Sequence, residues 1–161
     1  MLVTGSRSLA DPGTPIDESA GAKEAFLDAI WSFADEHPDQ TVLVVGGEAS
    51  GPDAWAKSFV HLRTSLSVAS RSPCAFEHLQ VRCDGAWIRS SVTGETRGRW
   101  REGRAHPLDR NTELVAQAKR LAAGGPLHCL AVVHARSRTG GTLDTIRKAR
   151  EAGFRITTVN V

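Results

Sequence analysis

Three glycine-rich segments carry the residue types that hold phosphate groups in proteins. The first is Gly5-Ser6-Arg7, the second spans residues 46–53, and the third spans residues 138–142. Glycine allows the backbone to approach a ligand closely and to adopt positive φ. A loop that opens a helix also exposes free amide donors at the positive end of the helix dipole, which suits an anion. Together the segments predict a binding site for a phosphate-bearing ligand.

Each segment also has a simpler interpretation. Residues 46–47 fit a tight turn between a strand and a helix, and Arg7 fits a surface charge. Residues 140–142 fit a loop in which Thr142, or Thr139 before it, caps the next helix. The dinucleotide fingerprint Gly-x-Gly-x-x-Gly is absent after the first strand, and so is the Walker lysine pattern. The prediction therefore depends on the segments taken together.

Several arginines and two tryptophans occur in residues 84–109, a stretch without visible periodicity. The side chains are Arg89, Arg97, Arg99, Arg101, Arg104 and, just beyond, Arg110, with Trp87 and Trp100 among them. Arginine suits phosphate and tryptophan can stack on a base, so one interpretation is a lid over a nucleotide. A second is a platform for single-stranded nucleic acid, which Glu95, Glu102 and Asp109 disfavour by diluting the charge. A third is a solvated loop whose tryptophans pack on the domain.

Composition narrows the class of protein. The 161 residues fit a single domain, and 40% apolar and 24% charged residues are ordinary for a soluble globular protein. A net charge of +2 is too small to indicate a nucleic acid or a membrane surface as partner. No segment resembles a signal peptide or a membrane span, so the expected location is the cytoplasm.

Metal, disulfide and serine hydrolase chemistry are not expected. The cysteines Cys74, Cys83 and Cys129 are odd in number and form no Cys-x-x-Cys pair, and Cys129 sits in an apolar run typical of a core. The histidines His106, His128 and His134 show no helix-spaced metal pattern. Ser6 lacks a plausible His–Asp partner set. We therefore expect neither a metal nor a cofactor.

The elements that must position the glycine-rich segments alternate between strands and helices. Short β-prone or apolar runs predict strands at 2–4, 41–45, 78–83, 127–133 and 155–161, with helices between them. Such alternation is typical of an α/β fold, with a mostly parallel sheet of about five strands and helices on both faces. Ligands bind such sheets outside the carboxyl ends of the strands, where strand order reverses. We expect the glycine-rich segments, which follow strands, to lie at that edge.

Four motifs in this order resemble the SLOG superfamily, and within it the YspA-related branch of bacterial and phage proteins. They are Gly5-Ser6-Arg7, then Gly46-Gly47 with Gly51, Asp53 and Ala54, then Arg110-Asn111, then Gly141-Thr142 with Asp144, Ala149 and Gly153. The resemblance covers most of the chain apart from 64–77 and part of 84–109. It implies a Rossmann-like three-layer sandwich whose loops bind nucleotides or nucleotide-derived ligands, and it implies a homodimer or higher oligomer. The superfamily includes phosphoribohydrolases and a DNA-processing protein.

The third segment departs at four positions from the phosphoribohydrolases that the chain resembles, because their proline, their first two glycines and their glutamate are missing. Those enzymes carry Pro-Gly-Gly-x-Gly-Thr-x-x-Glu, whereas residues 137–145 place Thr145 at the glutamate position. Asp144 lies one residue earlier, about 100° around the helix. A carboxylate would stabilise positive charge on a ribose that loses its base. The candidates are Asp144, Glu48 and Asp53, of which Asp53 fits a helix cap better.

The favoured hypothesis is a single domain, residues 1–161, that binds a nucleotide-like ligand as a sensor or accessory protein. Its alternatives are a nucleoside 5'-monophosphate phosphoribohydrolase, which cleaves an N-glycosidic bond, and a protein that binds single-stranded nucleic acid. The candidate ligand-binding residues are Gly5, Ser6, Arg7, Gly46, Gly47, Asp53, Trp100, Arg110, Asn111, Gly140, Gly141 and Thr142. If the protein is an enzyme, the candidate catalytic residues are Asp144, Arg110 and Glu48.

Overall fold

The computed structural model places strands and helices in alternation along the chain. The described residues are 1–6, 9, 16–47, 51–66, 75–81, 86–88, 96–99, 107–135 and 140–161, with the backbone alone at 16–18, 63–66, 86–88, 96–99 and 107. In chain order the elements are β1 (Leu2–Gly5), α1 (Ile16–Asp35), β2 (Thr41–Gly46), α2 (Pro52–Leu66), β3 (Ala75–Val81), β4 (Ala86–Ile88), β5 (Thr96–Arg99), α3 (Pro107–Ala122), β6 (His128–Val133), α4 (Gly141–Glu151) and β7 (Arg155–Asn160).

Within these ranges the strands form one sheet in the order β5-β4-β3-β2-β1-β6-β7. The five strands from β3 to β7 in this order are parallel, which confirms the predicted α/β fold with a mostly parallel sheet. The chain builds outward from β1 to β3 and then returns to β6, on the other side of β1. Strand order therefore reverses between β1 and β6, which is where ligands bind in open α/β sheets.

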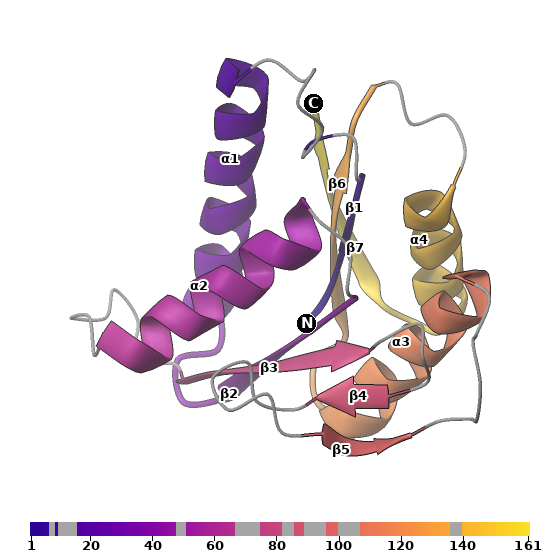
Figure 1. The fold of residues 1–161 in the computed structure, drawn as a ribbon. Helices are drawn as coiled ribbons and strands as arrows, with labels where there is room; N and C mark the ends of the chain where they lie inside the picture. Colours follow the sequence, from indigo (N-terminus) through magenta and orange to yellow (C-terminus); the bar gives the residue numbers. More distant parts are fainter. Residues whose placement is uncertain are drawn as a thin grey trace.

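The helices cover the sheet in two pairs and give the fold three layers. Figure 1 shows α1 and α2 on one face of the sheet and α3 and α4 on the other. Phe26, Ile30 and Phe59 belong to the apolar cluster under α1 and α2. Leu114 and Cys129 belong to the cluster under α3 and α4. Both faces of the central strands are thus buried, and the predicted place of Cys129 in the core is confirmed.

Two short strands extend the sheet where the sequence shows no periodicity. β4 and β5 have three and four residues, too few to display an alternating pattern, and they add antiparallel strands beside β3. Part of the stretch 84–109, expected to be a lid, is therefore sheet edge. β3 begins at Ala75 and ends at Val81, earlier than the predicted 78–83, because alternation already starts at Phe76.

Candidate functional site

Ser6 joins the carboxyl ends of β1 and β6 at the point where strand order reverses. Its backbone N–H donates to the carbonyl of Val132 at 3.0 Å, and its Oγ accepts from the N–H of His134 at 3.1 Å. The side chain is almost completely buried. Ser6, a candidate ligand-binding residue, therefore holds two loops of the edge together from inside the fold.

The start of α2 presses against the end of β1. A Cβ added at Gly5 would lie 2.1 Å from Cγ of Pro52, so only glycine fits at this position. Gly51, just before the helix, has φ +70°, and a Cβ there would lie 3.1 Å from the carbonyl oxygen of Ser6. Pro52 occupies the first helical position, where its missing N–H has no partner to lose. Gly5 thus serves packing between strand and helix.

Asp53 holds the glycine loop after β2. It lies in the first turn of α2, and its Oδ1 accepts from the N–H of Gly47 at 2.7 Å. The residue is only 5% exposed. Its carboxylate also lies next to Gly46, because a Cβ added there would be 3.3 Å from Oδ1. Asp53 therefore holds the backbone of residues 46–47 in place and puts a negative charge beside them.

Arg110 reaches the same loop from the opposite face of the sheet. The first turn of α3 carries it, and the atoms Cζ, Nη1 and Nη2 lie 3.1, 3.2 and 3.4 Å from the position of a Cβ at Gly47. Arg110 is 7% exposed, and its Nε is buried without a hydrogen-bond partner among the described residues. A guanidinium stays charged in proteins, so a buried, incompletely paired one favours an anion nearby.

Asn111 ties α3 to α4. Its Nδ2 donates to the carbonyl oxygen of Gly141 at 3.0 Å and to Oδ2 of Asp144 at 3.2 Å. The side chain is 2% exposed. Two neighbouring residues of α3 thus contact two glycine-rich segments, since Arg110 lies against Gly47 and Asn111 bonds Gly141. These contacts bring most of the described candidate residues together at the carboxyl edge of the sheet.

Asp144, a candidate catalytic residue, is engaged in ion pairs. Its carboxylate lies 2.7 Å from Nζ of Lys148 and 2.9 Å from Nη2 of Arg147. Burial raises the pKa of this carboxyl, but the hydrogen bonds from these two side chains and from Asn111 outweigh burial, so the pKa is lowered. Thr145, at the glutamate position of the phosphoribohydrolases, is buried and donates its hydroxyl to the Gly141 carbonyl at 2.8 Å.

Within the described part of the chain, no side chain caps the first turn of α4. Gly140 is the N-cap residue, with φ 128°, and no side chain at that position bonds the helix amides. The interpretation in which Thr142 caps the helix is wrong, because Thr142 lies inside the first turn. Thr139 lies outside the described residues. Uncapped amides at the positive end of a helix suit an anionic group.

His78 also lies beside the glycine loop, although we did not identify it from the sequence as a candidate site residue. It is 2% exposed on β3, and neither ring nitrogen has a hydrogen-bond partner within the described ranges. Nε2 lies 3.6 Å from the position of a Cβ at Gly46. Burial, with a smaller effect of Lys57, lowers the pKa of His78 to about 4, so the ring is neutral at pH 7. The one feature of the sequence that could have indicated the position of His78 is the alternation in β3, which directs His78 to the same face of the sheet as Phe76.

Several candidates lie outside the part of the chain that the structure describes. These are the side chains of Arg7, Glu48 and Trp100 and, of the arginine-rich stretch, those of Trp87, Arg89, Arg97, Arg99, Arg101 and Arg104. Among the residues that are described, no three His, Cys, Asp or Glu side chains come together as metal ligands. The helices of the same residues include none with the length and apolar character needed to cross a membrane.

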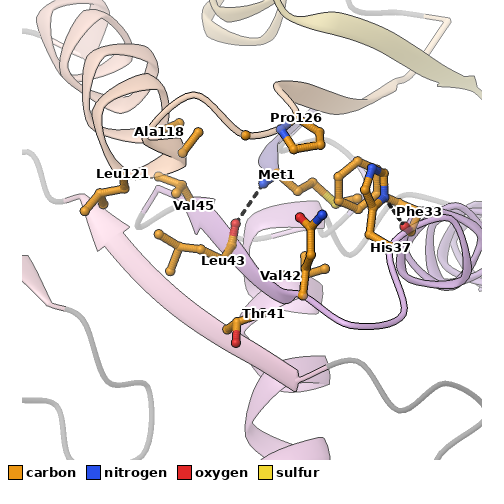
Figure 2. Close-up of a pocket in the computed structure, with 13 residues that line it drawn as sticks. Met1, Phe33, His37, Thr41, Val42, Leu43, Val45, Ala118, Leu121 and Pro126 are labelled. Atoms are coloured by element: carbon orange, nitrogen blue, oxygen red, sulfur yellow. Dashed lines mark hydrogen bonds between the residues drawn. The ribbon is translucent and has the colours of Figure 1, made fainter.

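A small pocket lies at the opposite edge of the sheet. It has a volume of about 110 Å³, and Figure 2 shows Met1, Leu43 and Pro126 among its walls. The amine of Met1 donates to the carbonyl of Leu43 at 2.8 Å, and burial lowers the pKa of this amine to about 6. Because Met1 precedes β1 and Thr41 begins β2, whereas Gly5 and Gly46 end these strands, the pocket is remote from the candidate site.

Comparisons of the chain with protein-family models, with curated proteins and with solved structures give no match.

Proposed function

We propose that this protein binds a phosphate-bearing, nucleotide-like ligand at the carboxyl edge of its parallel sheet, with the anionic group beside Arg110. The observation that carries the proposal is the buried guanidinium, whose Nε has no acceptor among the described residues. Burying an unpaired polar group costs free energy, and an anion accepting a charge-assisted hydrogen bond would recover it. Arg110 lies where α/β sheets bind ligands.

The neighbouring elements supply further support. The first turn of α4, which no described side chain caps, begins at Gly141, and Asn111 holds that turn beside Arg110. A phosphate between these groups would meet helix amides and a guanidinium together. The order of motifs that resembles the SLOG superfamily points to the same ligand class.

Binding is a better fit to the described carboxylates than N-glycosidic hydrolysis. Asp144 is paired with Lys148 and Arg147, and Asp53 accepts from the Gly47 amide. A carboxylate that must stabilise positive charge on a sugar needs a free face toward that sugar. The role that fits these contacts is that of a sensor or accessory domain which holds its ligand intact.

Calorimetric titration tests the proposal. The purified protein is titrated with AMP, ADP-ribose, NAD, cyclic AMP and inorganic phosphate, and the titrations are repeated with Arg110→Gln and with Arg150→Gln, whose arginine is exposed on α4. We expect binding of at least one ligand, weakened about tenfold or more by Arg110→Gln and unchanged by Arg150→Gln. If the protein binds none of these ligands, the proposal is contradicted. If Arg110→Gln binds them with the affinity of the wild-type protein, the anionic group does not lie beside Arg110.

A further inference from the structure

The two side chains with buried, unpartnered polar atoms lie against one dipeptide. Among the described residues these atoms are Nδ1 and Nε2 of His78 and Nε of Arg110. His78 lies against Gly46, and Arg110 lies against Gly47. Each residue is more than nine-tenths buried. Because most buried polar groups in folded proteins are hydrogen-bonded, two exceptions on either side of residues 46–47 point to a common cause.

The two sides of the dipeptide differ in chemistry. Arg110 comes from α3 and presents a positive charge. On the other side, His78 shares its surroundings with the carboxylate of Asp53, since both lie within 3.6 Å of the position of a Cβ at Gly46. A phosphate beside Asp53 would meet a like charge, whereas a hydroxyl can donate to the carboxylate and exchange a hydrogen bond with a neutral imidazole.

We infer that His78 is a specificity-determining residue that contacts an uncharged, hydroxyl-bearing part of the ligand on the α2 side of Gly46, while Arg110 holds the anion. The inference rests on the proposed function and deepens it, because it names a sugar phosphate as the moiety that the site recognises. His78 lies in the middle of β3 opposite Val44, and its buried ring reaches Gly46, the last residue of β2. Its neutral state at pH 7 leaves one nitrogen to accept and one to donate.

Two probes separate the two halves of the site. Inorganic phosphate tests the anion position alone, and ribose 5-phosphate adds the hydroxyls. Both are titrated into the wild-type protein, His78→Leu, His78→Gln and His61→Leu, where His61 is an exposed histidine of α2 and serves as the matched control. Unfolding temperatures are recorded for each variant without ligand.

We expect the wild-type protein and His61→Leu to bind ribose 5-phosphate at least tenfold more tightly than phosphate. His78→Leu should lose that preference and keep an equal or higher unfolding temperature, because leucine removes a buried group that lacks a partner. His78→Gln, which keeps a donor and an acceptor, should recover part of the preference.

The remaining outcomes contradict the inference. An unchanged preference in His78→Leu means that the ligand does not contact this residue. Unfolding of His78→Leu, or a lower unfolding temperature with both affinities reduced, shows a structural role instead. These results leave the proposed function intact, whereas a wild-type protein that binds neither probe nor the nucleotides overturns both.

Discussion

The side-chain amide of Asn111 donates to the carbonyl oxygen of Gly141 at 3.0 Å and thereby joins the first turn of α3 to the first turn of α4. The same Nδ2 donates to Asp144 at 3.2 Å. The donor of both hydrogen bonds is buried, since Asn111 is 2% exposed, and the hydrogen bonds themselves are partly buried. This amide sets the relative position of the two helix starts together with Nζ of Lys148, which donates to the carbonyl oxygen of Leu108 at 2.7 Å.

Replacing Asn111 by aspartate should destabilise the fold. The carboxylate cannot donate to Gly141, and it faces the carboxylate of Asp144 in a buried setting. We expect the free energy of unfolding to fall by about 3 kcal/mol, measured by urea denaturation. Asn160→Asp, at an exposed position of β7, is the control and should change it by less than about 0.5 kcal/mol. Equal urea midpoints for the two variants would show that the Asn111 link contributes little.

Gly5 should tolerate no side chain. The Cβ of alanine would overlap the Pro52 ring, whose nearest atom lies 2.1 Å away and cannot rotate aside. We expect Gly5→Ala to lower the free energy of unfolding by about 3 kcal/mol or more. Gly21→Ala, in α1 with no atom within 4 Å of the new Cβ, should raise it by roughly 0.5–1 kcal/mol. A stable Gly5→Ala protein would mean that α2 can move away from β1.

Gly47→Ala should reduce ligand affinity more than stability. Its Cβ would lie 3.1 Å from Cζ of Arg110, so the guanidinium at the end of a flexible side chain must shift by a few tenths of an ångström. We expect about tenfold weaker binding of AMP or phosphate, about 1.4 kcal/mol, in calorimetry. Thermal unfolding should remain close to that of the wild-type protein. Unaltered affinity would indicate that the position of Arg110 is not critical for the anion.

Acidification should destabilise the protein through His78. The pKa of this histidine is lowered from 6.5 to about 4 in the folded state, so the unfolded chain binds more protons between these values. Stability is therefore fully present above about pH 6.5 and is lost as the pH falls toward 4, by roughly 3 kcal/mol. Denaturant titrations at several pH values should show this slope in the wild-type protein and a shallower one in His78→Leu. If the wild-type protein and His78→Leu show the same dependence of stability on pH, a group other than His78 causes the loss of stability.

The fold and half of the site can be predicted from the sequence. Continuous apolar runs such as residues 41–45 predict buried parallel strands, because both faces of such strands are covered. Glycine-rich segments after strands predict the carboxyl edge as the site, and the structure brings Gly47 and Gly141 there with Arg110 and Asn111. These features are local patterns joined by a simple rule of topology.

The remainder depends on tertiary contacts that no local pattern encodes. A histidine within a strand resembles an ordinary core residue, and His78 stands out only through the absence of partners for its ring among the described residues. The pairing of Asp144 with Arg147 and Lys148 is an exception, because it follows from a local spacing of three and four residues on a helix, from which we predicted no ion pair. The short strands β4 and β5 acquire their structure from β3, which they extend.

The bridge that Ser6 makes between β1 and β6 has a consequence for how this protein could diversify. Because Ser6 bonds both Val132 and His134, contacts within the fold itself hold the ends of β1 and β6 together. A preorganised frame lowers the entropy lost on association. Substitutions at His78 or Arg110 could therefore redirect the chain to new ligands one side chain at a time, without rebuilding the strands beneath them.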